Sequence, residues 1–245
     1  MNLKKSLATI IALGMLFTGC NLSKEEEKTV ADKATQQKTM TKVQNDVNEI
    51  MNKDYDYVLK NMGIPYCTTY YIDTESLEKL DIININELNH FTNIRLIYPK
   101  YTSDNQLGTS AIYIELNNNK VVEVQTNEFS KYDIKEDEVM PSTDLIIDMY
   151  DYNSSIPLNS MKYKDFTKYI GKSLDKIESL VSIEDDNFEV YDTNRKKMVL
   201  GYLLKDEDGN INKLLTVVES ENIIRDIRVI STSDSIDLVI KNLME

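Results

Sequence analysis

Two alternating segments around an asparagine run constrain the fold of this 245-residue chain more than any other feature. Residues 110–116 place apolar side chains at every second position, and residues 120–126 do the same with valines. Successive side chains of a strand point to opposite faces, so each segment predicts a strand with one apolar face. The three asparagines at 117–119 favour a tight turn. Together they predict an antiparallel hairpin.

The rest of the chain repeats one order of elements, with helical patterns first and strands after them. Helical spacing of apolar residues marks 43–62, 164–170, 174–181 and 234–244. Strand patterns mark 66–72, 94–98, 110–116 and 120–126, and then 188–192, 198–204, 213–219 and 223–230. The best internal match aligns residues 112–116 with residues 215–219. The predicted fold class is therefore α+β, with two tandem units of helices followed by a four-stranded antiparallel sheet.

Turns and charge runs predict the boundaries of these units. We expect a signal peptide over 1–19, a flexible tether over 20–38, a first α+β unit over 39–132, a linker over 133–160, and a second α+β unit with a C-terminal helix over 161–245. Residues 145–149 are a candidate short element inside the linker.

The first twenty residues have the pattern of an export signal, with Lys4 and Lys5 before an apolar run that is too short to span a membrane comfortably. The stretch from Leu16 to Cys20 resembles the lipobox of bacterial lipoproteins, although Phe17 stands where that family usually has leucine. In that family the cysteine thiol receives a diacylglyceryl group and the peptide is cut just before it. The resemblance implies that Cys20 is the lipidated residue of a signal-peptide-bearing lipoprotein, a palmitate-type anchor on the extracytoplasmic face of the cell membrane.

The remainder of the chain is similar to a family of small envelope lipoproteins. That family includes the outer-membrane assembly lipoproteins and the β-lactamase inhibitory proteins, the latter built from two tandem copies. The residues that carry the resemblance are Met62-Gly63-Ile64-Pro65 in the first unit and Ile170-Gly171-Lys172-Ser173-Leu174 in the second. The second copy departs from the pattern, since it has Ser182-Ile183-Glu184 where the first has Gly-x-Pro. The resemblance implies protein binding on an open sheet face and no enzymatic activity.

Charge and composition exclude several functions. The formal net charge is −13, so the chain lacks the basic footprint that nucleic-acid binding requires. With Cys20 lipidated, Cys67 has no cysteine partner, and its one possible catalytic partner is His90. The plainer interpretation is a small apolar thiol in a strand and a histidine in a loop.

Short motifs for nucleotide and metal binding are incomplete. Gly171-Lys172-Ser173 lacks the preceding glycine of a phosphate-binding loop, because that position is Phe166. Residues 206–210 begin like a calcium loop, but Ile211 and Val217 stand where glycine and glutamate are needed, so a hairpin turn is expected instead. We therefore predict no cofactor and no metal site. A cell-wall glycan hydrolase that uses paired carboxylates remains an alternative, and so does a ligand-sensing or immunity lipoprotein.

Tyrosines clustered in the predicted strands are the candidate binding residues. Aromatic side chains on an open sheet suit protein recognition, whereas the alternative interpretation is packing within the core and across strands. The candidates are Tyr66, Tyr70, Tyr71, Tyr98 and Tyr113. The predicted function is a membrane-anchored module that binds an envelope protein or the peptidoglycan cell wall.

Overall fold

In the computed structural model the chain divides between Ser142 and Thr143 into two compact units, here called the first and second unit. The structure describes residues 36–41, 43, 46–73, 75, 93–104, 106–129, 143–150, 156–157, 166–179, 187–206, 208 and 210–231. The predicted signal peptide, Cys20, His90 and the predicted C-terminal helix lie outside these residues. Residues 36–38, assigned above to the end of the tether, are helical.

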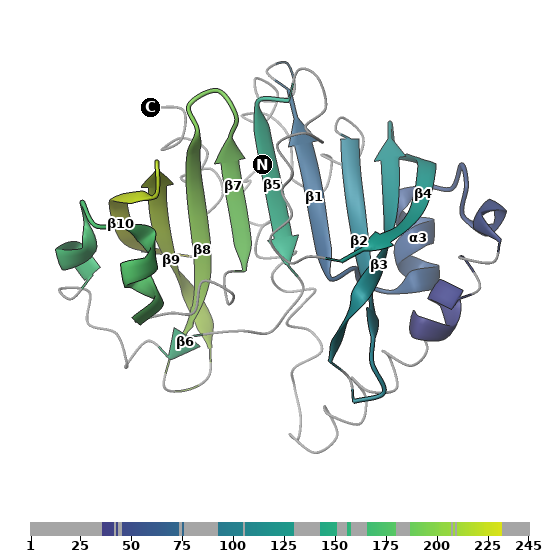
Figure 1. The fold of residues 1–245 in the computed structure, drawn as a ribbon, viewed down its shortest axis with the longest axis horizontal. Coiled ribbons are helices and arrows are strands. Elements are labelled where there is room, and N and C mark those ends of the chain that lie inside the picture. Colours follow the sequence, from purple (N-terminus) through teal and green to yellow (C-terminus); the bar gives the residue numbers. More distant parts are fainter. Residues whose placement is uncertain are drawn as a thin grey trace. The chain divides into compact units, whose positions relative to one another are not determined.

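The first unit is an antiparallel sheet with the strand order β1-β2-β3-β4 (Figure 1). Its strands are β1 (Cys67–Ile72), β2 (Asn93–Tyr101), β3 (Leu107–Asn117) and β4 (Lys120–Glu128). The predicted hairpin is confirmed, because β3 and β4 pair around Asn118 and Asn119, whose φ angles of 49° and 57° are those of a tight hairpin turn.

One face of this sheet carries the core of the first unit. Ile94, Leu96 and Tyr98 of β2 are fully buried, as are the three apolar residues of β3 that share their face. The α-helix α3 (Tyr55–Met62) buries Val58 and Met62. Tyr98 donates a hydrogen bond of 2.9 Å to the carbonyl of Gly63 at the end of α3, which places α3 on this side of the sheet.

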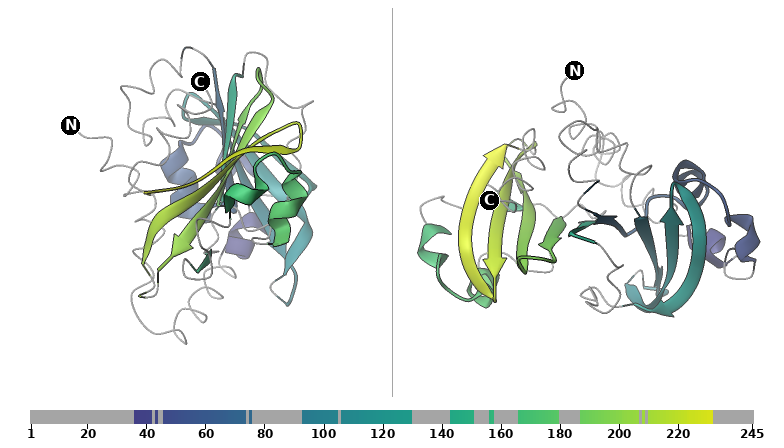
Figure 2. Two further views of the ribbon diagram at one scale, coloured as in Figure 1. Left: turned by 90° about the vertical axis from the view of Figure 1, so that its left-hand side faces the viewer. Right: turned by 90° about the horizontal axis from the view of Figure 1, so that it is seen from above.

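Local sequence explains where α3 begins and ends. Asp54 is its N-cap and accepts a hydrogen bond from the Tyr57 backbone N–H at 2.8 Å. Gly63 ends the helix in a left-handed conformation (φ 79°), which glycine adopts without strain. The 3₁₀ helix η1 (Val47–Glu49) precedes α3. Figures 1 and 2 show the helical segments of this unit gathered on one side of its sheet.

The second unit contains five antiparallel strands in the order β5-β7-β8-β9-β10. They are β5 (Leu145–Tyr150), β7 (Phe188–Asp192), β8 (Lys197–Lys205), β9 (Ile211–Ser220) and β10 (Ile223–Ser231), and the short β6 (Ile156–Pro157) pairs in parallel with β8. Strand β5 is the short element expected inside the linker, and it pairs with β7.

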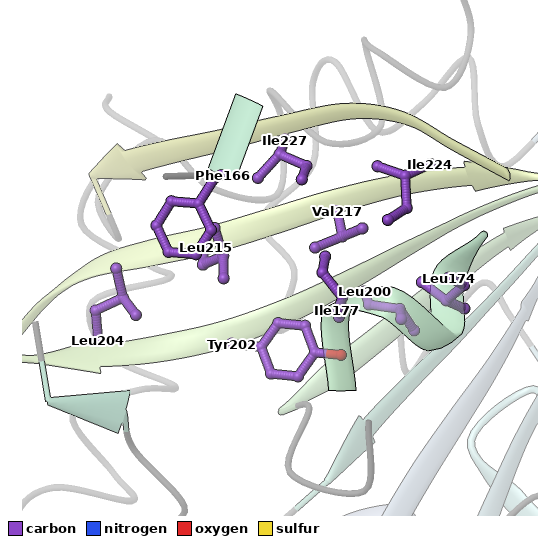
Figure 3. Close-up of a cluster of buried hydrophobic side chains, with 10 residues drawn as sticks. All are labelled: Phe166, Leu174, Ile177, Leu200, Tyr202, Leu204, Leu215, Val217, Ile224 and Ile227. Atoms are coloured by element: carbon purple, nitrogen blue, oxygen red, sulfur yellow. The ribbon is translucent and has the colours of Figure 1, made fainter. Parts of the chain in front are cut away.

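Short helical segments cover one face of the second sheet. They are the 3₁₀ helices η5 (Thr167–Tyr169) and η6 (Leu174–Ser179). Phe166, Leu174 and Ile177 from this part of the chain pack against apolar residues of β8, β9 and β10 (Figure 3). Burying such side chains stabilises the unit by roughly 1.5–3 kcal/mol each.

The predicted fold class is wrong. Strands dominate the described residues, and the described helical segments are short, so the described part of the chain is nearly all-β rather than α+β. The second sheet also has five strands along its path rather than four. The strand positions are confirmed, but the predicted helices over 164–170 and 174–181 are reduced to 3₁₀ segments.

The two units nevertheless share one local arrangement. In the first, the Asn52 N–H donates to Val121 O (3.0 Å) and the Val121 N–H donates to Lys53 O (2.8 Å). In the second, the Gly171 N–H donates to Ile224 O (2.8 Å) and the Ile224 N–H donates to Lys172 O (2.8 Å). Asn52 and Gly171 both have left-handed backbones, with φ of 62° and 82°. Each unit thus fastens the start of its last strand to the turn before a helical segment.

Candidate functional site

The candidate site is the face of the first sheet opposite α3. Side chains of directly paired residues share a face, so this face carries Arg95 of β2, Glu115 of β3 and Glu123 of β4 in one row. The next row holds Ile97, Tyr113 and Gln125. We call these six residues, with Asn127, the β2–β4 face.

Arg95 is held at the centre of this face. Its Nε lies 2.5 Å from Glu115 Oε1, and its guanidinium carbon lies 5.6 Å from the ring centre of Tyr71 and 6.0 Å from that of Tyr113. A guanidinium is attracted to the negative faces of aromatic rings and forms strong hydrogen bonds to carboxylates. The side chains of Arg95 and Glu115 are 18% and 12% exposed. The pair is therefore partly withdrawn from water and held in one geometry.

Toward the edge of the sheet, the β2–β4 face becomes polar and exposed. Gln125 donates to Glu123 Oε1 at 2.5 Å, and Asn127 donates to Gln125 Oε1 at 2.9 Å. The Tyr113 hydroxyl donates to the Glu128 carbonyl at 3.1 Å, while its ring stays half-buried. An aromatic and arginine centre beside an exposed polar margin is the usual composition of a protein-binding surface.

The five candidate tyrosines do not lie on one surface. Tyr70 and Tyr98 are in the core on the α3 side, with exposed fractions of 6% and 0%. Tyr71 and Tyr113 both lie beside Arg95 on the opposite face, although Tyr71 is only 7% exposed. Tyr66 is half-buried and contacts the edge of Phe129, with ring centres 5.5 Å apart.

The core tyrosines form a separate buried group. Burial raises the pKa of Tyr70 well above its usual value, and the neighbouring Tyr55 raises it further. Burial likewise raises the pKa of Tyr98 well above its usual value, and burial raises the pKa of Tyr55 as well. These hydroxyls stay protonated at physiological pH and belong to the packing of the unit.

Sequence reasoning missed Arg95 and Glu115. Both lie in segments predicted as strands. Their proximity depends on the register between β2 and β3, which the alternation of apolar residues does not determine. Alternation alone would have placed Arg95 on the face opposite Ile94 and Leu96. That was the available signal for a charged residue on the non-core face.

The remaining motifs have structural roles in the described residues. Lys172 and Ser173 lie at the turn before η6, and Asp206 accepts hydrogen bonds from the N–H groups of Asp208 (3.0 Å) and Asn210 (2.7 Å), as a hairpin turn requires. Cys67 is buried in β1. Within the described ranges no group of three or more metal-binding side chains occurs. No helix among those residues is long and apolar enough to cross a membrane.

No family model and no curated protein matches the chain. Among solved structures, one similar chain is a candidate β-lactamase inhibitor protein from Streptococcus mutans, with 11% sequence identity and a TM-score of 0.26. The alignment covers 75% of this chain and 91% of that chain.

Proposed function

We propose that this chain is a lipid-anchored binding protein on the outer side of a bacterial membrane, and that it recognises a protein partner through the β2–β4 face. The observation that carries the proposal is the position of Arg95 between two tyrosine rings and a carboxylate, on the sheet face opposite α3. Held in this way, Arg95 loses little conformational freedom on binding.

The composition of the β2–β4 face supports protein recognition over catalysis. Tyrosine and arginine are the residue types that most often dominate the binding energy of protein interfaces. The flanking Glu123, Gln125 and Asn127 are exposed and hydrogen-bonded to one another, so they offer a polar rim. The half-buried Ile97 adds apolar area beside Tyr113.

The test compares two tyrosine variants in one co-purification. The bait is the full chain with Cys20→Ser in mild detergent, cross-linked to solubilised envelope proteins of the source cell and read by mass spectrometry. Tyr113→Ala removes the ring beside Arg95. Tyr57→Ala is the matched control, because Tyr57 is an exposed tyrosine of α3 in the same unit.

We expect one saturable partner with the parent chain and with Tyr57→Ala. Removal of an aromatic hot spot costs about 2 kcal/mol or more, so Tyr113→Ala should weaken capture by at least about 30-fold. Equal capture by both variants would remove the β2–β4 face from the proposal. If the parent chain captures no protein in a saturable way, the result argues against protein binding.

A further inference from the structure

One row of the β2–β4 face carries two carboxylates and a single cation. Arg95, Glu115 and Glu123 are directly paired across β2, β3 and β4, so their side chains share this face. Arg95 and Glu115 neutralise each other, because they form an ion pair at 2.5 Å with side chains that are 18% and 12% exposed. Glu123 lies on the other side of Glu115 and is exposed. Like charges directly opposite each other destabilise a sheet, so this row lacks one positive charge.

Glu123 is held in place without a cation from the described part of the chain. The Gln125 amide donates to Glu123 Oε1 at 2.5 Å, and Asn127 donates in turn to Gln125 at 2.9 Å. No described lysine or arginine forms an ion pair with Glu123, and its Oε2 accepts no hydrogen bond from the described residues. One carboxylate oxygen is therefore positioned to accept a donor from another molecule.

The second unit supplies the corresponding cation itself. Val121 and Ile224 are the residues that each unit fastens to its left-handed turn, and a register shift follows each of them. Two residues further along stand Glu123 and Asp226, which are therefore equivalent positions. Arg228, two residues after Asp226, forms an ion pair with it, whereas β4 has a glutamine at the matching place. The same carboxylate position is thus satisfied within the second unit and lacks its cation in the first.

We infer that the partner protein supplies this cation, as a lysine side chain that pairs with Glu123 on the β2–β4 face. The inference rests on the proposed function, since it names the chemical group that the same face recognises. Because Gln125 bonds to Oε1, one oxygen is left, which suits the point charge of an ammonium better than the two parallel hydrogen bonds of a guanidinium. The net charge of −13 also attracts a basic surface.

Three variants of the full chain with Cys20→Ser test the inference, with solubilised envelope proteins of the source cell as the probe. Glu123→Gln removes the charge of the carboxylate. Glu128→Gln is the matched control, because the register places this exposed glutamate of β4 on the opposite face. Gln125→Arg keeps Glu123 but gives it the intramolecular cation that Asp226 has in the second unit.

We expect Glu123→Gln and Gln125→Arg to weaken capture of the partner at least about tenfold, and Glu128→Gln to stay within about twofold of the parent. Gln125→Arg adds an exposed ion pair and should leave stability in urea unchanged, so its loss of capture cannot result from unfolding. A water-soluble carbodiimide joins a carboxylate directly to a lysine amine. With the parent chain it should link Glu123 to a lysine of the partner.

Unchanged capture by Glu123→Gln would overturn the inference, and so would a captured partner in which carbodiimide links no lysine to Glu123. If Tyr113→Ala loses the partner while Glu123→Gln and Gln125→Arg retain it, the lysine inference fails and the proposed function stands. If Glu123→Gln loses the partner while Tyr113→Ala retains it, the lysine contact stands and the tyrosine hot spot fails instead. If the parent chain captures no protein in a saturable way, both fail together.

Discussion

The glycine at position 201 illustrates how one residue shapes the second sheet. Gly201 on β8 is directly paired with Phe188 on β7, and the Phe188 ring lies in the space that a side chain at 201 would fill. An aromatic ring placed over a cross-strand glycine shields backbone that glycine leaves open. Phe188 and Gly201 therefore pack against each other, and this contact helps to hold β7 beside β8.

Substituting Gly201 tests this packing. A Cβ at 201 overlaps the Phe188 ring, so Gly201→Ala forces the ring aside and should lower the free energy of unfolding by about 1–3 kcal/mol. Urea unfolding followed by circular dichroism measures the loss. In a Phe188→Ala background the same substitution should cost much less, because the clash is gone. Additive losses in the double variant would contradict the proposed packing.

The buried tyrosines predict how stability depends on pH. Tyr70 and Tyr98 have pKa values raised well above the usual value by burial, while unfolded tyrosines ionise near pH 10. Above about pH 10 the unfolded chain thus binds fewer protons than the folded chain, and the free energy of unfolding falls as pH rises. Below that pH the contribution is fully present.

Unfolding in urea at about pH 9 and about pH 11 measures this dependence. We expect Tyr70→Phe to reduce the difference in unfolding free energy between the two pH values. Tyr57→Phe is the control, because it removes the hydroxyl of an exposed tyrosine in the same unit. A pH response that is the same in all three proteins would exclude the buried tyrosines as its cause.

The same tyrosines show what the sequence can and cannot predict at the level of residues. Alternation correctly assigns Tyr70 and Tyr71 to opposite faces of β1. It does not reveal which face is covered, because that depends on where α3 and the neighbouring strands pack. Tyr71 approaches Arg95 only through the pairing of β1 with β2, a contact between segments about 24 residues apart in sequence.

At the scale of elements, both units have a turn with a left-handed residue before a helical segment. Asn52 and Gly171 occupy corresponding places, and both turns bond to the last strand of their unit. Glycine adopts this conformation freely and asparagine tolerates it, whereas other residues pay roughly 1 kcal/mol or more.

Because Asn52 and Gly171 have the same backbone conformation, each position should accept the residue found at the other. A Cβ at position 171 meets no atom within 4 Å, so backbone conformation alone should decide the effect. Gly171→Asn should be nearly neutral, while Gly171→Ala should lower the free energy of unfolding by about 1 kcal/mol. Asn52→Gly should be tolerated in the first unit. Chemical denaturation of the three variants measures these differences, and an equal loss for Ala and Asn at 171 would contradict the argument.

The elements also explain why the strands were predictable and the fold class was not. The strand segments are rich in β-branched and aromatic residues, and asparagine or glycine turns lie between several of them. The described helical segments are shorter than the patterns that predicted them. Residues 174–179 have an apolar stripe, but they form a 3₁₀ helix because a few buried contacts, rather than helix propensity, hold them. Counting such stripes as full helices produced the α+β prediction.

At the scale of the whole molecule, the net negative charge disfavours direct binding of the folded units to a lipid surface. A net charge of −13 repels the anionic surface of a bacterial membrane, and basic clusters of the kind that bind lipid headgroups are lacking in the sequence. We propose that the lipid on Cys20 holds the chain on the membrane. Two acyl chains suffice for stable anchoring, whereas a single chain binds only marginally.

Replacing Cys20 therefore tests the proposed localisation. Cys20→Ala should move the exported chain from the membrane fraction to the soluble extracytoplasmic fraction, and it should abolish incorporation of labelled palmitate in the source cell. Cys67→Ala is the matched control, since Cys67 is buried and should leave both measurements unchanged. The folded units should be unaffected by the loss of lipid, so the two variants can be compared by circular dichroism after purification. Membrane retention of Cys20→Ala would show that another segment holds the chain, and the β2–β4 face would then have to be considered as a membrane contact.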